Sequence, residues 1–331
     1  MEYRKLGQSD LNLSVVTFGA WAAGGWMWGG TERSEAVKAI QAGFDYGVTS
    51  IDTAPAYGQG LSEEIVGEAI KGIPRDKIQI LTKFGLSWTG KKGQFFFNSR
   101  DNQGKPLDIY RYSGKDGIIK ECETSLRLLG TDYIDLYQIH WADPTTPVQE
   151  TMEAVAQLIK EGKVRYAGVC NYDVELMKEA AKYINLVSDQ VPYSMVRRDI
   201  ENDLVPYLIE NNKSVLAYSP LQRGLLAGKI KPGHGFSEGD TRADLPYYSD
   251  RNIKLTNSFL ETIKPLAEEK NVAISQLVIR WTIEQPGITI ALVGARNAAQ
   301  AIENAKAAQV KLTPEEISFI NSGLNKLKLE L

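Results

Sequence analysis

Eight short apolar runs recur along the chain, and segments with helical periodicity lie between them. This alternation limits the fold more than any other feature. The runs are rich in Val, Ile and Leu and do not alternate with polar residues, as is typical of strands buried on both faces of a parallel sheet. They lie at residues 15–19, 48–52, 78–83, 134–140, 164–170, 185–190, 214–219 and 289–294.

The segments between the runs have the pattern of amphipathic helices. Residues 34–47 place Ala36, Ile40 and Phe44 on one face and end at a glycine, a common helix stop. Residues 62–70 begin with Ser62, predicted to be the N-cap, and acidic residues follow in the first turn, where they suit the helix dipole. Further helices are expected at 117–130, 148–162, 174–183 and 203–212.

Eight β-then-α units predict a parallel sheet closed into a (β/α)8 barrel (a TIM barrel), with the helices outside. We expect an N-terminal β-hairpin, long βα loops at the C-terminal face, and a single domain over residues 1–331, because one barrel often takes this whole length. An open doubly wound sheet is the competing fold. It usually carries GxGxxG after its first strand, but GQGLSE and GHGFSE lack the third glycine, and the first run leads into GAWAAGG.

Composition excludes several classes of protein. A net charge of −3 and a pI near 5.7 give no electrostatic footprint for nucleic acid. The two cysteines, Cys122 and Cys170, form no CxxC pair, so neither a disulfide framework nor a zinc site is indicated, and a reducing cytoplasm fits best. With only two histidines, His140 and His234, a metal-dependent hydrolase is poorly supported. His234 is expected to be exposed and inert.

Neither a signal peptide nor a membrane helix is expected near the N-terminus. The first ten residues are charged and lack the apolar core of a signal peptide. Residues 11–31 carry no charge and are long enough to suggest a membrane helix, but five glycines and several polar residues argue against one. We interpret the stretch as a strand followed by a pocket-lining loop with Trp21, Trp26 and Trp28.

Four polar residues follow the predicted strands closely and suggest carbonyl chemistry. Asp52 and Tyr57 lie in IDTAPAYG, Lys83 in LTKFG and His140 in YQIHW. A free tyrosine holds its proton firmly, and an adjacent ammonium should lower its pKa. Lys83 would supply that charge, Asp52 would hold Lys83, and His140 would orient a substrate carbonyl toward Tyr57 while a hydride attacks the carbonyl carbon.

Each of these residues also has an ordinary structural explanation. An aspartate after a strand often caps a turn or a helix, a tyrosine packs, and a lysine extends to the surface from a strand end. Their joint placement favours a functional site, because barrel enzymes carry their functional groups at the C-terminal ends of the strands.

The chain resembles the aldo-keto reductases along nearly its whole length. The similarity runs through LGQSDLNLSVVTFGAWA, IDTAPAYGQGLSEEIVGEAI, TDYIDLYQIHWAD, EGKVRYAGVCNY, AYSPLQRGLLAGK and ALVGARNAAQAIENAKA. It looks nearest to the bacterial branch of general-stress and inositol-locus reductases, which are in turn similar to the β-subunits of voltage-gated potassium channels.

The resemblance implies that NADP lies extended across the barrel mouth. Asn171 and Gln190 would bind the nicotinamide carboxamide and Tyr218 would stack on the ring. Arg296 would bind the 2′-phosphate, as a guanidinium at a helix N-terminus suits a dianion, with Gln300 and Asn304 around the adenine. The other implied contacts are Gly19, Ala20, Trp21, Asp52, Cys170, Ser219, Pro220, Leu221, Gln222, Arg223, Gly224, Lys229, Gly294 and Ala295.

Cys170 departs from the family, which usually has serine before the asparagine. A thiol is a weaker hydrogen-bond donor, so its contact to the carboxamide is in doubt. A redox-sensitive thiol is the alternative to a buried, inert one.

The substrate pocket is expected to be aromatic, with Trp21, Trp26, Tyr57, Trp88, His140 and Trp141 lining it. Residues 85–115 should form an ordered lid or hairpin over the pocket, or else their aromatics only pin the loop to the barrel. Residues 228–250 are expected to fold over the cofactor.

These features predict NADPH-dependent reduction of aldehydes and ketones to alcohols, with sugars and 2-oxoaldehydes left open. A regulatory NADPH-binding protein with little turnover is the alternative. The expected partner is a small carbonyl compound, with no metal, nucleic acid or membrane, and a monomer is expected.

Overall fold

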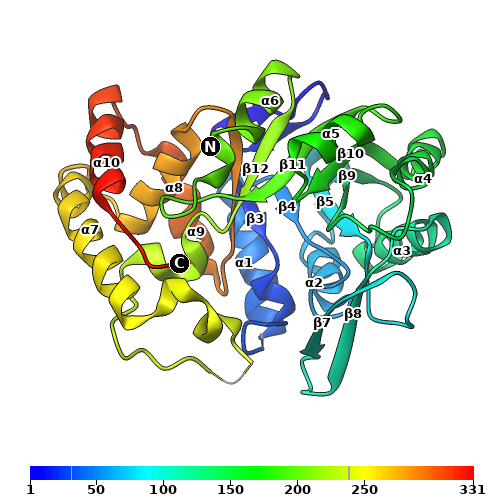
Figure 1. Ribbon diagram of the computed structural model, residues 1–331, viewed down its shortest axis with the longest axis horizontal. Helices are drawn as coiled ribbons and strands as arrows, with labels where there is room; N and C mark the ends of the chain where they lie inside the picture. The colour runs from blue at the N-terminus through cyan, green and yellow to red at the C-terminus, as the bar shows by residue number, and fades with distance from the viewer. Residues whose placement is uncertain (31, 238) are drawn as a thin grey trace.

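The parallel strands close into a barrel at the centre of the molecule (Figure 1). The computed structural model describes residues 1–30, 32–237 and 239–331. Around the barrel the strands follow chain order, and neighbouring strands are parallel. They are β3 (Val16–Gly19), β4 (Ser50–Asp52), β5 (Gln79–Phe84), β9 (Ile134–Ile139), β10 (Val164–Cys170), β11 (Leu186–Pro192), β12 (Ser214–Tyr218) and β13 (Ile288–Val293). The predicted (β/α)8 barrel is confirmed.

Helices surround this barrel (Figure 1). Those expected from the periodicity are α1 (Arg33–Asp45), α2 (Leu61–Ala69), α3 (Lys115–Leu129), α4 (Val148–Lys160), α5 (Val174–Ala180) and α6 (Leu204–Glu210). The remaining helices are α7 (Asp250–Glu269), α8 (Ile274–Glu284), α9 (Ala298–Lys306) and α10 (Pro314–Lys326).

The predicted N-cap of α2 is wrong. Gly60 occupies the N-cap position with a φ of 99°, and Ser62 lies inside the helix. The Ser62 hydroxyl is buried, donates to the Ala20 carbonyl at 2.8 Å and hydrogen-bonds the Thr53 hydroxyl at 2.8 Å. Ser62 therefore ties α2 to the loop after the first barrel strand instead of capping the helix.

The predicted N-terminal hairpin, β1 (Tyr3–Lys5) and β2 (Asn12–Ser14), closes the end of the barrel opposite the site. The Gly7 amide donates to Ser214 at the start of β12, and Ser14 hydrogen-bonds Ser50 at the start of β4. Leu6 and Leu13 are fully buried among the aliphatic side chains of the barrel interior, which include Leu81, Leu136, Val187, Leu216 and Ile290. The hairpin therefore fills this end of the barrel and leaves the other end for a site.

The long segment after β5 forms an antiparallel sheet of β6 (Leu86–Ser87), β7 (Gln94–Arg100) and β8 (Pro106–Arg111). Beyond β12, the second long loop contains the short 3-10 helices η5 (Thr241–Asp244) and η6 (Pro246–Tyr248), and its Glu238 lies outside the described residues.

The uncharged stretch 11–31 forms β2, β3 and the 3-10 turn η1 (Ala22–Gly24), and Thr31 lies outside the described residues. Within the described ranges, no helix combines the length and apolar character needed to cross a membrane.

Candidate active site

Lys83 and Asp52 form a buried ion pair at the C-terminal ends of β5 and β4. The Lys83 Nζ donates to Asp52 Oδ1 at 2.5 Å and to the Thr53 carbonyl at 2.9 Å. The other Asp52 oxygen accepts from Gln190 Nε2 at 2.7 Å and from Gln138 Nε2 at 3.2 Å. These bonds satisfy both charges, which burial would otherwise make costly.

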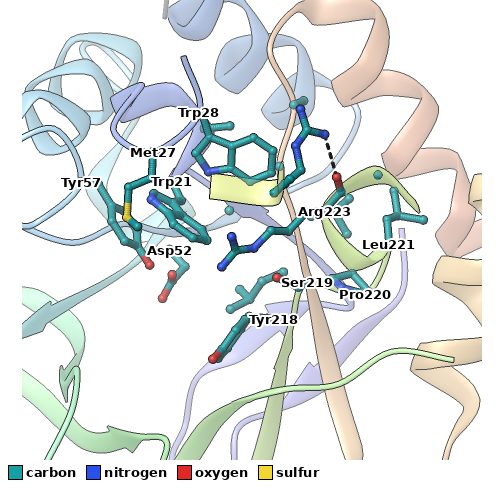
Figure 2. Close-up of a pocket in the computed structure, with 18 of the residues that line it drawn as sticks. Trp21, Met27, Trp28, Asp52, Tyr57, Tyr218, Ser219, Pro220, Leu221 and Arg223 are labelled. Carbon is teal, nitrogen blue, oxygen red and sulfur yellow. Dashed lines mark hydrogen bonds between the residues drawn. The ribbon is translucent and has the colours of Figure 1, made fainter. Parts of the chain in front are cut away.

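Tyr57 lies over this pair, between Trp21 and His140. The Lys83 ammonium is 4.9 Å from the centre of the Tyr57 ring, and the His140 ring packs edge-on against Tyr57 at 5.7 Å between ring centres. Trp21 stacks on Tyr57 with ring centres 5.9 Å apart (Figure 2). The structure thus brings together all four residues predicted to be catalytic.

The Lys83 charge acts on the Tyr57 pKa in the expected direction, but burial outweighs it. Burial raises the pKa of Tyr57 above its usual value, and the Lys83 charge only partly opposes this effect. Burial alone would lower the pKa of Lys83, but the Asp52 carboxylate and Tyr57 raise it, so the ammonium keeps its charge. Burial, followed by the Lys83 charge, holds the pKa of His140 well below its usual value. His140 is therefore neutral at pH 7.

One cavity of about 660 Å³ opens above these side chains and runs across the barrel mouth. Its wall includes Asp52, Tyr57 and His140, whereas Lys83 lies behind them. Of the residues expected to hold the cofactor, all but Ala20 and Gln222 line this cavity. The Gln222 side chain points away and accepts a hydrogen bond from Ser194, because the chain turns sharply there.

Two residues expected around the nicotinamide, Asn171 and Tyr218, contact each other. Asn171 has a φ of 59°, in the left-handed region that asparagine tolerates. Its Nδ2 donates to the His140 carbonyl at 3.1 Å, and its Oδ1 accepts from the Tyr218 hydroxyl at 3.0 Å. Burial raises the pKa of the Cys170 thiol well above its usual value, as expected of an inert cysteine.

A tight turn follows β12 and presents a guanidinium to the cavity. Ser219, Gln222 and Arg223 have φ values of 57°, 44° and 48°, and Gly224 continues the turn at 96°. The Arg223 guanidinium points over Trp21, 4.6 Å from the ring centre (Figure 2). A guanidinium held at the cavity wall in this way suits a phosphate group.

The far end of the cavity holds further basic residues. Arg296 precedes α9 and donates to the Trp28 carbonyl at 2.9 Å. Its own amide donates to Gln300 Oε1, and Asn304 Nδ2 donates to the Gly294 carbonyl. Lys229 and Arg242 line the same cavity.

The sequence predictions missed some residues of this wall and misplaced one. Arg242, whose guanidinium lies 5.2 Å from the centre of the Trp28 ring, and Glu303 were not predicted. His234, predicted to be inert, is exposed but lines the cavity. Trp88 lies outside the cavity and faces a neighbouring hollow with Leu107 and Tyr110, because β6 ends at Ser87 and does not carry its alternation on to Trp88.

Metal ligation has no geometric basis among residues 1–30, 32–237 and 239–331. No three His, Cys, Asp or Glu side chains in these ranges are arranged to hold an ion.

Comparison with known proteins defines the class of this site. A family model described as the aldo/keto reductase family matches residues 15–324. The aldo-keto reductase YhdN of Bacillus subtilis (strain 168) is 38% identical over 302 residues, which cover 91% of this chain and 86% of that protein. The NADH-specific methylglyoxal reductase of Escherichia coli (strain K12) is 34% identical over 320 residues, which cover 95% of this chain and 96% of the relative.

The structural comparison agrees with these matches. The glycerol dehydrogenase AKR11B4 from Gluconobacter oxydans superposes with a TM-score of 0.88 at 36% identity, over 98% of this chain and 95% of that one. The chain belongs to the aldo/keto reductase family. Members of this family are oxidoreductases that act on carbonyl or alcohol groups with a nicotinamide cofactor.

Proposed function

We propose that this protein reduces aldehydes and ketones to alcohols with NADPH, and that Tyr57 donates the proton. The observation that carries the proposal is the group formed by Tyr57, His140 and the Lys83–Asp52 pair at the wall of one cavity. A bound nicotinamide cofactor would supply the hydride. The residues of the chain would then bind the carbonyl, orient it and deliver the proton.

His140 and Tyr57 divide the work on the carbonyl oxygen. A neutral imidazole can donate one hydrogen bond to that oxygen without giving up its proton, and so hold it beside the Tyr57 hydroxyl. As negative charge develops on the oxygen, the phenol transfers its proton to it. The Lys83 ammonium stabilises the phenolate that remains, and Asp52 keeps Lys83 in place.

The cavity wall fits a dinucleotide with phosphate groups. Arg223, Lys229, Arg242 and Arg296 all line it; Arg242 is paired with Asp240, and Glu303 also lines the wall, so basic side chains are in the majority there. We assign Arg223 and the turn after β12 to the pyrophosphate and Arg296 to the 2′-phosphate that distinguishes NADPH from NADH. Because one relative is described as NADH-specific, the choice between the two cofactors needs a direct test.

The experiment is NADPH and NADH oxidation by the purified protein, in parallel with Tyr57→Phe. The panel should include methylglyoxal, an aromatic aldehyde and dihydroxyacetone, with glycerol in the oxidative direction. Turnover that is lost in Tyr57→Phe supports the proposal. Binding of NADPH without turnover of any compound would overturn it and favour a regulatory, NADPH-sensing protein.

A further inference from the structure

The β7–β8 hairpin is fastened to the loop after β3 through Trp26. The Trp26 side chain is buried, and its Nε1 donates to the Ser99 hydroxyl at 3.0 Å and to the Arg100 carbonyl at 3.1 Å. Its ring stacks on Phe97 with ring centres 6.2 Å apart. The hairpin therefore contacts both the N–H group and the apolar ring of the Trp26 indole. These contacts fix the orientation of the Trp26 side chain and how far it inserts.

A second contact lies at the tip of the hairpin. Asn102, in the turn between β7 and β8, donates from Nδ2 to the Gly24 carbonyl at 2.9 Å. Gly24 and Gly58 come so close that a Cβ built on Gly58 would lie 2.3 Å from the Gly24 carbonyl oxygen and 3.2 Å from Asn102 Nδ2. A Cβ on Gly24 would lie 2.6 Å from the Tyr57 carbonyl oxygen. The loop after β3, the loop after β4 and the tip of the β7–β8 hairpin thus meet next to the backbone of Tyr57.

These contacts matter because the apolar half of the cavity is made by the same segments. Trp26 and Met27 come from the loop after β3, and Phe96 and Phe97 from the hairpin. Trp141 follows β9 and packs on Phe96 with ring centres 5.4 Å apart. The width of this aromatic wall depends on how the hairpin sits against the loop, and the hydrogen bonds of Trp26 and Asn102 join these two segments.

We propose that Asn102 is a positioning residue that determines specificity: it holds the β7–β8 hairpin on the loop after β3 and thereby keeps the aromatic wall closed on planar, apolar carbonyl substrates. The inference rests on the carbonyl reduction proposed above. Asn102 touches neither the reacting atoms nor the residues assigned to the cofactor, so its effect should appear in substrate selection and not in cofactor affinity.

The test compares Asn102→Asp with Gln103→Glu. Asn102→Asp is nearly isosteric but replaces the amide donor with a carboxylate facing the Gly24 carbonyl. Gln103→Glu adds the same charge at the next position of the same turn, and both residues are exposed. We expect Asn102→Asp to raise the KM for 4-nitrobenzaldehyde about fivefold or more, as the loss of one net hydrogen bond implies. The kcat/KM for methylglyoxal and the NADPH affinity should stay within about twofold of wild type, on the same basis, because neither depends on that bond.

Hydrogen exchange gives a second readout, which needs no turnover. Asn102→Asp, and Asn102→Ala as an uncharged variant, should speed amide exchange in residues 22–30 and 94–111, whereas Gln103→Glu should leave both segments unchanged. Unchanged exchange would overturn the proposal, and so would an equal loss of kcat/KM for both substrates. If wild type turns over none of the compounds in the panel given above, the proposed function fails instead, and the exchange data still decide whether Asn102 holds the hairpin.

Discussion

Lys83→Met directly tests the buried ion pair beneath Tyr57. Methionine has a chain of similar length, so it fills the space and removes only the ammonium with its bonds to Asp52 and the Thr53 carbonyl. The pair is almost fully buried, with side-chain exposures of 1% for Lys83 and 4% for Asp52. Removing one partner of such a pair typically costs about 3–5 kcal/mol, because the remaining charge has no counterion.

We expect a loss near the lower end of that range, about 3 kcal/mol. The Asp52 carboxylate keeps the amide groups of Gln190 and Gln138 as donors, at 2.7 Å and 3.2 Å. Turnover should fall at least about 10²-fold, the smaller end of what assisted proton transfer contributes, since the phenolate would lose its cation. The measurements are urea unfolding at pH 7 and steady-state carbonyl reduction.

Lys213→Met is the matched control. Lys213 is half-buried and donates to the Leu186 carbonyl at 2.6 Å at the opposite end of the barrel. Its replacement should cost about 1 kcal/mol, the value of one hydrogen bond, and leave turnover unchanged. If Lys83→Met is no more destabilising than Lys213→Met, the ion pair does not carry the energy assigned to it. Turnover within about threefold of wild type, far less than assisted proton transfer contributes, would remove Lys83 from the mechanism.

Two other variants test separate parts of the site, and a third, in α3, tests the pH dependence of stability. Tyr57→Phe should lower turnover by about 10²–10⁴-fold while NADPH affinity, measured by fluorescence titration, stays nearly intact; near-normal turnover would contradict the proposed proton donor. Arg296→Ala should weaken NADPH binding at least about tenfold, as the loss of a charge-assisted hydrogen bond implies, and spare NADH. An equal loss for both cofactors would show that Arg296 does not bind the 2′-phosphate. Glu121→Gln should flatten the decline of stability with pH in urea unfolding at pH 5 and pH 8, because burial, only partly offset by the hydrogen bond from the Gly85 amide, raises the pKa of the Glu121 carboxyl to about 8. The folded state keeps a proton that the unfolded chain loses above its ordinary pKa, so stability falls by up to about 1.4 kcal/mol per pH unit as the pH rises toward 8; equal slopes in wild type and variant would contradict this.

The barrel could be predicted from sequence because its signal is local. Each buried strand is a short β-branched run, and the predicted runs lie within two residues of the observed strands, as with 164–170 for β10 and 185–190 for β11. The joint position of Asp52, Lys83 and His140 follows from the same fact, since parallel strands in one barrel end at the same face. Tyr57 comes with them because its loop is only five residues beyond Asp52.

The predictions that failed concern residues whose positions depend on contacts between segments far apart in the sequence. Serine is a common N-cap residue, but the Ser62 hydroxyl donates to a carbonyl in the loop after β3, 42 residues away in sequence. Trp88 is aromatic, as pocket residues often are, but it follows the end of β6 and faces the neighbouring hollow with Leu107 and Tyr110. No local pattern pairs Asn102 with Gly24, which is 78 residues away in sequence. Such contacts are set by tertiary packing, so residue type alone does not reveal them.

In the proposed mechanism, the raised pKa of Tyr57 changes what Lys83 is needed for. A phenol does not have to ionise in the resting enzyme; it has to be a stronger acid than the alcohol being formed. The oxygen of a carbonyl receiving a hydride becomes an alkoxide, which is a stronger base than a phenolate, so the proton moves downhill even from a buried tyrosine. Lys83 then acts on the product of that step, because its charge stabilises the phenolate that burial disfavours. For Tyr57, the lysine charge is therefore required mainly in the transition state, where it changes kcat, whereas in the resting site the same charge serves as the counterion of Asp52.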